Sequence, residues 1–246
     1  MAKAEPRSHT ILITGANDGI GLILAKNYAK RGHRVLATGR QTISDDETHF
    51  GSPNVTYIRA DQEQPMAAAQ NIANAMRDLE WNGLDLAILN AGTGWVGIPQ
   101  EETPSSIAKQ VDVNLTANIC IAKAMGPWLF RRTGKLVFIG STAVKKPQGN
   151  FATYTATKAA LAGFARSLHE EWRGRASVQM IHPRATRTGM HGKAGLNIGI
   201  ARALFMSPKK AARAIMASIR ASERQRDITR TFAFLARFSR NREGYL

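Results

Sequence analysis

Six short runs of apolar and β-branched residues alternate with longer stretches in which apolar residues recur at helical spacing. The fourth run, LDLAIL, is apolar almost throughout, which is typical of a strand that a parallel sheet buries on both faces. Alternation of this kind, without an internal repeat or a linker, predicts one α/β domain over residues 1–246 with a doubly wound parallel sheet of the Rossmann-like type. The predicted strands cover residues 9–14, 33–38, 55–58, 84–89, 135–139 and 177–181, and the clearest predicted helices cover 22–31, 64–79, 106–130 and 151–172.

The composition allows such a domain and excludes several other classes. A chain of 246 residues with 43% hydrophobic residues can bury a sizeable core. The single cysteine, Cys120, excludes an internal disulfide framework and a metal site built from several cysteines, and we expect no metal. The first ten residues lack the apolar core of a secretory signal, and no run of about 18 apolar residues occurs. We therefore expect a cytoplasmic protein without a transmembrane helix.

The charge is the unusual part of the composition. The formal net charge is +16, from 34 Lys and Arg residues against 18 Asp and Glu residues. A charge of this size indicates either an anionic partner or simply a basic soluble surface. No nucleic-acid recognition motif accompanies it, so we expect no nucleic acid as a partner.

A glycine-rich turn separates the first predicted strand from the helix that follows it. Gly15, Gly19 and Gly21 stand there in the pattern T-G-x-x-x-G-I-G. Glycines in such a turn let the backbone approach a pyrophosphate, whose charge then lies at the N-terminus of the helix. The spacing differs from G-x-G-x-x-G, so the match to the common dinucleotide motif is partial, and a purely structural turn is the alternative.

The end of the second predicted strand indicates which dinucleotide binds. A carboxylate at this point would hold the ribose 2′-hydroxyl of NAD, whereas an Arg accommodates the 2′-phosphate of NADP. This chain has Gly39 and Arg40 there, and its next acidic residues come only at 45–47. The sequence therefore favours NADP(H), and a plain surface charge is the alternative role for Arg40.

A candidate acid/base pair follows the fifth predicted strand. Ser141 comes directly after that strand, and Tyr154 and Lys158 lie one turn apart if the chain is helical from Phe151. An ammonium group beside a phenol favours the phenolate and lowers its pKa towards the range that suits general acid/base catalysis. Taken alone, Y-x-x-x-K fits equally a helix with an exposed Lys and a half-buried Tyr.

The candidate residues share one position relative to the predicted strands. Ligands of doubly wound sheets bind at the carboxyl ends of the strands. The residues found at such an end, or just after it, are Gly15, Arg40, Asp61, Asn90, Ser141 and Pro183. We therefore expect them to meet at one site.

In this order and position the motifs resemble the short-chain dehydrogenase/reductase family in its single-domain form. The resemblance runs from about Thr10 to about Thr188 and rests on several separated motifs. The catalytic residues that it implies are Asn114, Ser141, Tyr154 and Lys158. The cofactor-binding residues that it implies are Gly15, Asn17, Asp18, Gly19, Ile20, Gly21, Arg40, Asp61, Asn90, Ala91, Gly92, Tyr154, Lys158, Pro183 and Thr188.

The resemblance also implies a role for each catalytic residue. Tyr154 would be the general acid/base, and Lys158 would lower its pKa and bind the nicotinamide ribose. Ser141 would position the substrate oxygen, and Asn114 would support a water that links the lysine to solvent. Asp61 would contact the adenine.

The family's proline-glycine motif after the sixth strand is altered in this chain. Pro183 and Thr188 fit the motif, and Thr188 is expected near the nicotinamide carboxamide or the pyrophosphate. Arg184 replaces the usual glycine, which puts the local backbone in doubt because glycine adopts conformations that Arg resists. Arg184 could also place a cation near the pocket.

The motifs and the resemblance together predict an oxidoreductase that uses NADPH to reduce a ketone or aldehyde to an alcohol. The expected cofactor is NADP(H), and the expected substrate is a small carbonyl compound or alcohol. We also expect the chain to form a homodimer or homotetramer. The alternative is a non-catalytic NADP(H)-binding partner or redox-sensing protein on the same fold.

The stretches outside the motifs give less specific expectations. We expect residues 93–96, 142–150 and 187–206 to form the substrate pocket, with 187–206 as a lid. Their apolar and cationic side chains suggest a carbonyl compound with apolar bulk, with or without an acid group. The basic segment 226–246 begins with a possible short strand near 226–229 and otherwise fits an amphipathic helix. Such a helix could lie on a membrane surface, or pack on a second subunit or on its own domain.

Overall fold

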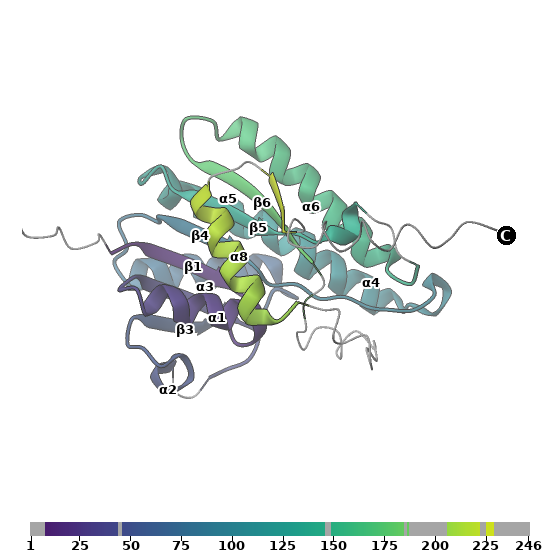
Figure 1. The fold of residues 1–246 in the computed structure, drawn as a ribbon, viewed down its shortest axis with the longest axis horizontal. Coiled ribbons are helices and arrows are strands. Elements are labelled where there is room, and N and C mark those ends of the chain that lie inside the picture. The colour runs from purple at the N-terminus through teal and green to yellow at the C-terminus, as the bar shows by residue number, and fades with distance from the viewer. Residues whose placement is uncertain are drawn as a thin grey trace, which may run out of the picture.

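Seven parallel strands form the central sheet, in the order β3-β2-β1-β4-β5-β6-β7 (Figure 1). The computed structural model describes residues 8–43, 46–145, 149–184, 186, 206–221 and 225–228. The strands are β1 (Thr10–Thr14), β2 (Arg34–Gly39), β3 (Val55–Arg59), β4 (Leu86–Leu89), β5 (Lys135–Ile139), β6 (Ser177–Pro183) and β7 (Gln225–Ile228). The predicted α/β doubly wound fold is confirmed.

The strand order reverses next to β1. The chain moves outwards from β1 to β2 and β3, and then crosses back to place β4 on the other side of β1. Thr14 pairs in register with Thr38 of β2, and Ile13 pairs with Ile88 of β4. The carboxyl ends of these three strands therefore lie together, and a reversal of this kind opens a crevice for a ligand.

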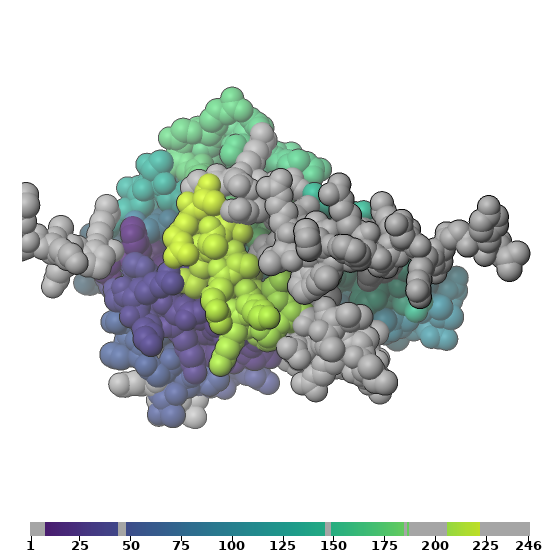
Figure 2. Space-filling model, in the orientation of Figure 1, coloured from purple at the N-terminus to yellow at the C-terminus, as the bar shows by residue number. Residues whose placement is uncertain are grey.

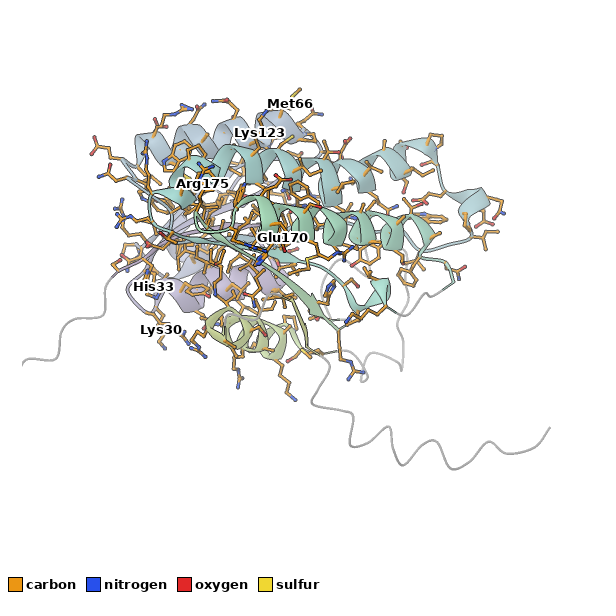
Figure 3. All side chains as sticks on the ribbon, turned by 90° about the horizontal axis from the view of Figure 1, so that it is seen from above. Lys30, His33, Met66, Lys123, Glu170 and Arg175 are labelled. Atoms are coloured by element: carbon orange, nitrogen blue, oxygen red, sulfur yellow. The ribbon has the colours of Figure 1, made fainter. Side chains whose placement is uncertain are left out.

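Helices cover both faces of the sheet (Figure 3). On one face α1 (Gly19–Ala29) packs against α8 (Pro208–Ala221), with the short α2 (Asp46–Phe50) beside α1; Figure 2 shows α8 in yellow-green against the purple N-terminal part. The other face carries α3 (Pro65–Asp78), α4 (Pro104–Val111), α5 (Ala117–Phe130) and α6 (Ala152–Glu171).

The sheet divides the core into two apolar clusters, one under each layer of helices. Leu24 of α1 and Ile215 of α8 belong to one cluster, and Ile72 of α3 and Leu161 of α6 belong to the other. All four residues of β4 are buried, as the apolar run LDLAIL predicts for a strand covered on both faces. The helices end where local sequence allows it: Gly32, after α1, has φ +80°.

The long helix predicted over 106–130 is interrupted. A π-helical turn, Asp112–Thr116, separates α4 from α5. A π-turn is rare, because it inserts one residue into the helical ladder, and it is frequently found at functional sites. Here the inserted turn contains Asn114, so the interruption falls on a predicted catalytic residue.

The last described residues, 225–228, form the edge strand β7. β7 pairs in parallel with β6, with Arg226 opposite Ile181 and Ile228 opposite Pro183. The possible short strand near 226–229 is therefore present as β7, because the free edge of β6 offers these residues backbone partners. Residues 229–246 lie outside the described residues, as does the expected lid except for Met206. No helix in the described part of the chain is long and apolar enough to cross a membrane.

Candidate active site

The loop between β1 and α1 is packed so closely that side chains have no room at two of its glycines. Gly15 has φ +62°, and a Cβ atom there would lie 2.7 Å from the Cα of Ala91. A Cβ atom on Gly21 would lie 2.1 Å from the carbonyl oxygen of Gly15. The glycine pattern therefore reflects both a left-handed turn and the close approach of the loop to the end of β4.

Hydrogen bonds fix this loop to the end of β4. The Nδ2 of Asn90 donates to the carbonyl oxygens of Thr14, at 3.0 Å, and Gly15, at 3.1 Å. In return, the Oγ1 of Thr14 accepts the backbone N–H groups of Asn90, at 3.0 Å, and Ala91, at 3.1 Å. Sequence reasoning missed the role of Thr14, because only these contacts, made 76 and 77 positions along the chain, show it.

The N-terminus of α1 faces the same edge of the sheet. The helix begins at Gly19, its first turn has no acidic residue, and the side chain of Asp18 does not cap it. The N-terminal N–H groups and the positive end of the helix dipole suit an anion such as a pyrophosphate.

The end of β2 lies beside the glycine loop. A Cβ atom on Gly39 would lie 2.6 Å from the Oδ1 of Asn17 and 2.5 Å from the hydroxyl oxygen of Tyr57. The Nδ2 of Asn17 also donates to the Oε1 of Gln41 at 3.1 Å. The structure thus brings Asn17, Gly39 and the residue that follows it, Arg40, into one region.

Arg40 has a carboxylate beside it that its own stretch of sequence lacks. Its Nη1 lies 3.5 Å from the Oε1 of Glu63, which belongs to the loop after β3. The Oδ1 of Asp61, in that same loop, accepts the backbone N–H of Glu63 at 3.1 Å. Sequence reasoning placed Arg40 and Asp61 at neighbouring strand ends but missed Glu63.

Tyr154 and Lys158 lie on α6, as the spacing predicts, and both are buried. Burial raises the pKa of Tyr154, while a hydrogen bond with the side chain of Ser141 lowers it to a smaller extent. The Oγ of Ser141 accepts the N–H of Ala143 at 3.2 Å, which leaves the Ser141 O–H to donate. The hydroxyls of Ser141 and Tyr154 therefore meet at the carboxyl edge of the sheet.

Lys158 is buried one turn after Tyr154 on α6. The pKa of Tyr154 responds here to burial and to Ser141, and the expected lowering of that pKa by Lys158 stays a prediction. Burial lowers the pKa of Lys158 itself to about 8, and its Nζ donates to the carbonyl oxygen of Ile139 at 3.1 Å. At neutral pH most Lys158 side chains still carry a proton.

Asn114 uses its whole side chain to join neighbouring segments. Its Oδ1 accepts the N–H of Thr93 at 2.9 Å, and its Nδ2 donates to the carbonyl oxygen of Thr93 at 2.9 Å and to the Oγ1 of Thr157 at 3.1 Å. Its backbone carbonyl accepts the Nδ2 of Asn118 at 3.0 Å. The π-turn therefore ties the loop after β4 to the helix that carries Lys158, and the predicted water at Asn114 stays a prediction.

A buried carboxylate supports the first turn of the tyrosine helix. Glu102 is 8% exposed, and its Oε2 accepts the hydroxyl of Thr153, the neighbour of Tyr154, at 2.6 Å. Its Oε1 accepts the hydroxyl of Ser106 at 3.0 Å and the side-chain amide of Gln110. Glu102 thus links α4 to α6, a connection that no sequence motif indicated.

The carboxyl end of β6 meets Ser141. The Nδ1 of buried His182 lies 3.0 Å from the carbonyl oxygen of Ser141, and since a carbonyl can only accept, this nitrogen carries the proton. Pro183 ends β6. The described non-glycine residues with a left-handed φ are Glu80, Thr133 and Asn150, and Arg184 is not among them. The backbone here accepts Arg184 without strain, while Thr188 lies outside the described residues.

The glycine loop lies at the carboxyl end of β1, and Ser141, Tyr154 and Lys158 lie by the carboxyl end of β5 in the same parallel sheet. The sequence model described as short chain dehydrogenase matches residues 9–199. The chain belongs to the short-chain dehydrogenase family. It is thus an oxidoreductase by family, built on one domain.

Three members show how this short-chain dehydrogenase compares with known proteins. It is 30% identical to the uncharacterised oxidoreductase YciK of Escherichia coli strain K12, over 75% of this chain and 76% of that protein. It is 31% identical to a hydroxysteroid 11-beta-dehydrogenase 1-like protein of Xenopus tropicalis, over 65% of this chain but only 57% of that protein. A short-chain dehydrogenase from Sphingobium yanoikuyae in complex with NADPH superposes with a TM-score of 0.81 at 26% identity, over 97% of this chain and 98% of that one.

Proposed function

We propose that this short-chain dehydrogenase reduces a ketone or aldehyde to an alcohol with NADPH. The observation that carries the proposal is the meeting of Ser141 and Tyr154 at the carboxyl edge of the sheet, with Lys158 one turn further along α6. Because burial raises the pKa of Tyr154, this residue is protonated at neutral pH and can give a proton. A protonated tyrosine suits reduction, in which a carbonyl oxygen gains a proton.

The glycine loop fits a dinucleotide. At Gly15 and Gly21 a side chain would clash with the protein's own backbone, so the tight turn that leads into the N-terminus of α1 requires glycine at both positions. The N–H groups at that N-terminus suit a pyrophosphate. The loop would hold the pyrophosphate, Asp61 the adenine, and Lys158 the nicotinamide ribose. When bound, NADPH supplies the hydride.

The side chains of the protein would handle the proton. The O–H of Ser141 holds the substrate oxygen, and Tyr154 donates its phenolic proton to the same oxygen as negative charge develops there. The ammonium group of Lys158 stabilises the phenolate that remains. Asn114 keeps α6 and the loop at Thr93 in register, so that the donor and the substrate oxygen stay within hydrogen-bonding distance.

The preference for NADPH rests on Arg40. The end of β2 has no acid to hold the 2′-hydroxyl of NAD. The side chain of Arg40, which is 45% exposed and follows Gly39, can reach a 2′-phosphate. The NADPH complex of the Sphingobium yanoikuyae protein supports the same choice.

The walls around Tyr154 favour a substrate with apolar bulk. A Cβ atom on Gly94 would lie 3.2 Å from the ring of Tyr154, and the ring of Phe151 packs edge-on at 6.4 Å from it. The N–H of Gly97 donates to the carbonyl oxygen of Asn150, which joins the two predicted walls of the pocket. These contacts support the predicted stretches 93–96 and 142–150, with Phe151 beside them, as the pocket next to the catalytic hydroxyls.

A panel of ketones and aldehydes with NADPH and with NADH tests the proposal, in parallel with Tyr154→Phe. We expect turnover with NADPH that the variant loses, with unchanged NADPH binding by fluorescence titration. Turnover that survives in Tyr154→Phe would overturn the mechanism. NADPH binding without turnover of any compound would favour the alternative, a non-catalytic NADP(H)-binding protein.

We also propose a homodimer or homotetramer. Large apolar side chains are exposed on and before α4: Ile98 at 49%, Ile107 at 39% and Val111 at 37%. A second copy of the chain would remove this surface from water. Light scattering coupled to gel filtration measures the assembly, and a monomer at micromolar concentration would contradict this part.

A further inference from the structure

Three charged side chains from three segments meet beside the end of β2. Arg40 follows β2, Glu63 lies in the loop between β3 and α3, and Lys109 lies on α4. The Oε1 of Glu63 lies 2.5 Å from the Nζ of Lys109 and 3.5 Å from the Nη1 of Arg40. One carboxylate oxygen therefore faces two cations, and its shorter contact is with the lysine.

The position of Glu63 conflicts with the ligand proposed for Arg40. A 2′-phosphate carries a charge of about −1.5 to −2 near pH 7, so its approach to Arg40 brings it towards the carboxylate of Glu63 as well. Like charges repel, and Glu63 also occupies one side of the guanidinium group. Lys109 reduces this repulsion because it neutralises the charge of Glu63. Its Nζ also lies closer to the Oε1 of Glu63 than the Nη1 of Arg40 does.

We infer that Glu63 limits how strongly the protein discriminates NADPH from NADH, and that Lys109 favours NADPH by acting through Glu63. The inference rests on the proposed binding of the 2′-phosphate by Arg40. It concerns specificity only, since neither residue contacts Ser141, Tyr154 or Lys158 through any described hydrogen bond.

Hydrogen bonds hold the backbone at Arg40 and Glu63, so we expect the side chains, and not the backbone, to adjust when a ligand binds. The Nε of Arg59 donates to the carbonyl oxygen of Arg40 at 3.1 Å, and Asp61 holds the N–H of Glu63. The three side chains are between 34% and 45% exposed, and solvent screens their interaction. Exposed charge pairs of this kind change a dissociation constant by up to about fivefold, and the change shrinks at high salt.

The test measures dissociation constants for NADPH and NADH by fluorescence titration at low salt. The proteins are the wild type, Glu63→Gln, Lys109→Met and the double variant. We expect Glu63→Gln to bind NADPH about two- to fivefold more tightly and NADH unchanged, since only NADPH brings the phosphate. Lys109→Met should weaken NADPH binding by about two- to fivefold, because Glu63 then faces the phosphate unneutralised.

The double variant separates an indirect role of Lys109 from a direct one. If Lys109 acts through Glu63, its removal should have little effect on NADPH binding in the Glu63→Gln background. An equal loss in both backgrounds would show that Lys109 attracts the phosphate directly and would overturn that half of the inference. An unchanged ratio of the two dissociation constants in Glu63→Gln would overturn the other half.

Matched controls account for the change in total charge. Lys30→Met removes an exposed cation and Glu171→Gln an exposed carboxylate, at positions outside the three-charge group. Lys30, labelled in Figure 3, precedes β2, whereas Arg40 follows it, so the two lie at opposite ends of that strand. Both controls should leave the ratio of the two dissociation constants unchanged. If Glu171→Gln shifted this ratio as much as Glu63→Gln does, net charge alone would explain the effect and the inference would be overturned.

Arg40→Ala distinguishes failure of this inference from failure of the proposed function. Loss of the NADPH preference in Arg40→Ala, together with no response to Glu63→Gln, overturns the inference alone. A wild-type preference for NADH overturns the proposed cofactor. Even then, a shift towards NADPH in Glu63→Gln supports the inference, because the ratio is compared with the wild type.

Discussion

Replacing Lys158 with Met should stabilise the fold at neutral pH while it removes reductase activity. Burial lowers the pKa of Lys158 from 10.5 to about 8, which corresponds to about 3 kcal/mol of folding free energy spent on keeping the ammonium group in the interior. Met has a side chain of similar length without a charge. It leaves the carbonyl oxygen of Ile139 without this donor, a loss of about 1 kcal/mol. The variant should therefore be more stable by about 2 kcal/mol at pH 7.

The size of this difference should depend on pH in a defined direction. Below about pH 8, Lys158 is charged in both the folded and the unfolded chain, and the cost of burying the charge is fully present. Between about pH 8 and 10.5 the folded protein loses the proton while the unfolded chain keeps it, so wild-type stability rises relative to the variant. The advantage of Lys158→Met should therefore close over this range.

Urea unfolding followed by tryptophan fluorescence at pH 7 and pH 10 measures both effects. Lys123→Met, which removes an exposed lysine from α5, is the matched control and should leave stability nearly unchanged at both pH values (Figure 3). A Lys158→Met protein that is less stable than the wild type at pH 7 would refute the reasoning. So would a stability difference that is the same at both pH values, since it would show that the buried charge is not its cause.

Three further changes test other parts of the site. Tyr154→Phe should lower kcat by about 10²- to 10⁴-fold with unchanged NADPH affinity, measured by steady-state kinetics and titration, and a small loss would assign the proton to another group. Gly15→Ala should lower the free energy of unfolding in urea by about 1–3 kcal/mol and weaken NADPH binding, because its Cβ atom meets Ala91 and its φ is left-handed. A normal affinity for NADPH would contradict the proposed role of the glycine loop in holding the pyrophosphate. Glu102→Ala should cost about 2–4 kcal/mol, because it leaves buried donors on α4 and α6 unpaired, and an unchanged melting temperature would contradict that network.

The sequence predicted the sheet and the edge where the site lies, because both depend on local patterns. Alternation of apolar runs with helical spacing is a local property, and so is the left-handed turn that requires Gly15. The placement of Tyr154 and Lys158 on one face of a helix follows from their spacing alone. These features needed no knowledge of which distant segments touch.

The contacts that tune the site could not be predicted, because they join segments far apart in the chain. Glu63 meets Lys109 across 46 positions, and Thr14 binds Asn90 across 76. The π-turn at Asn114 left no mark on the helical spacing of the apolar residues around it. The direction of the pKa shift of Tyr154 also depends on burial, which a motif does not reveal.

One strand end sets the geometry of both halves of the site. At the end of β4, Asn90 holds the glycine loop through Thr14. Two residues later, a Cβ atom on Gly92 would lie 3.3 Å from the Oδ1 of Asn114 and 3.4 Å from the Nζ of Lys158. The cofactor loop and the catalytic lysine therefore pack against the same short segment, which leaves Lys158 little room to move towards solvent. The burial that makes Lys158 costly to the fold follows from the close packing that would hold its ammonium group beside a bound dinucleotide.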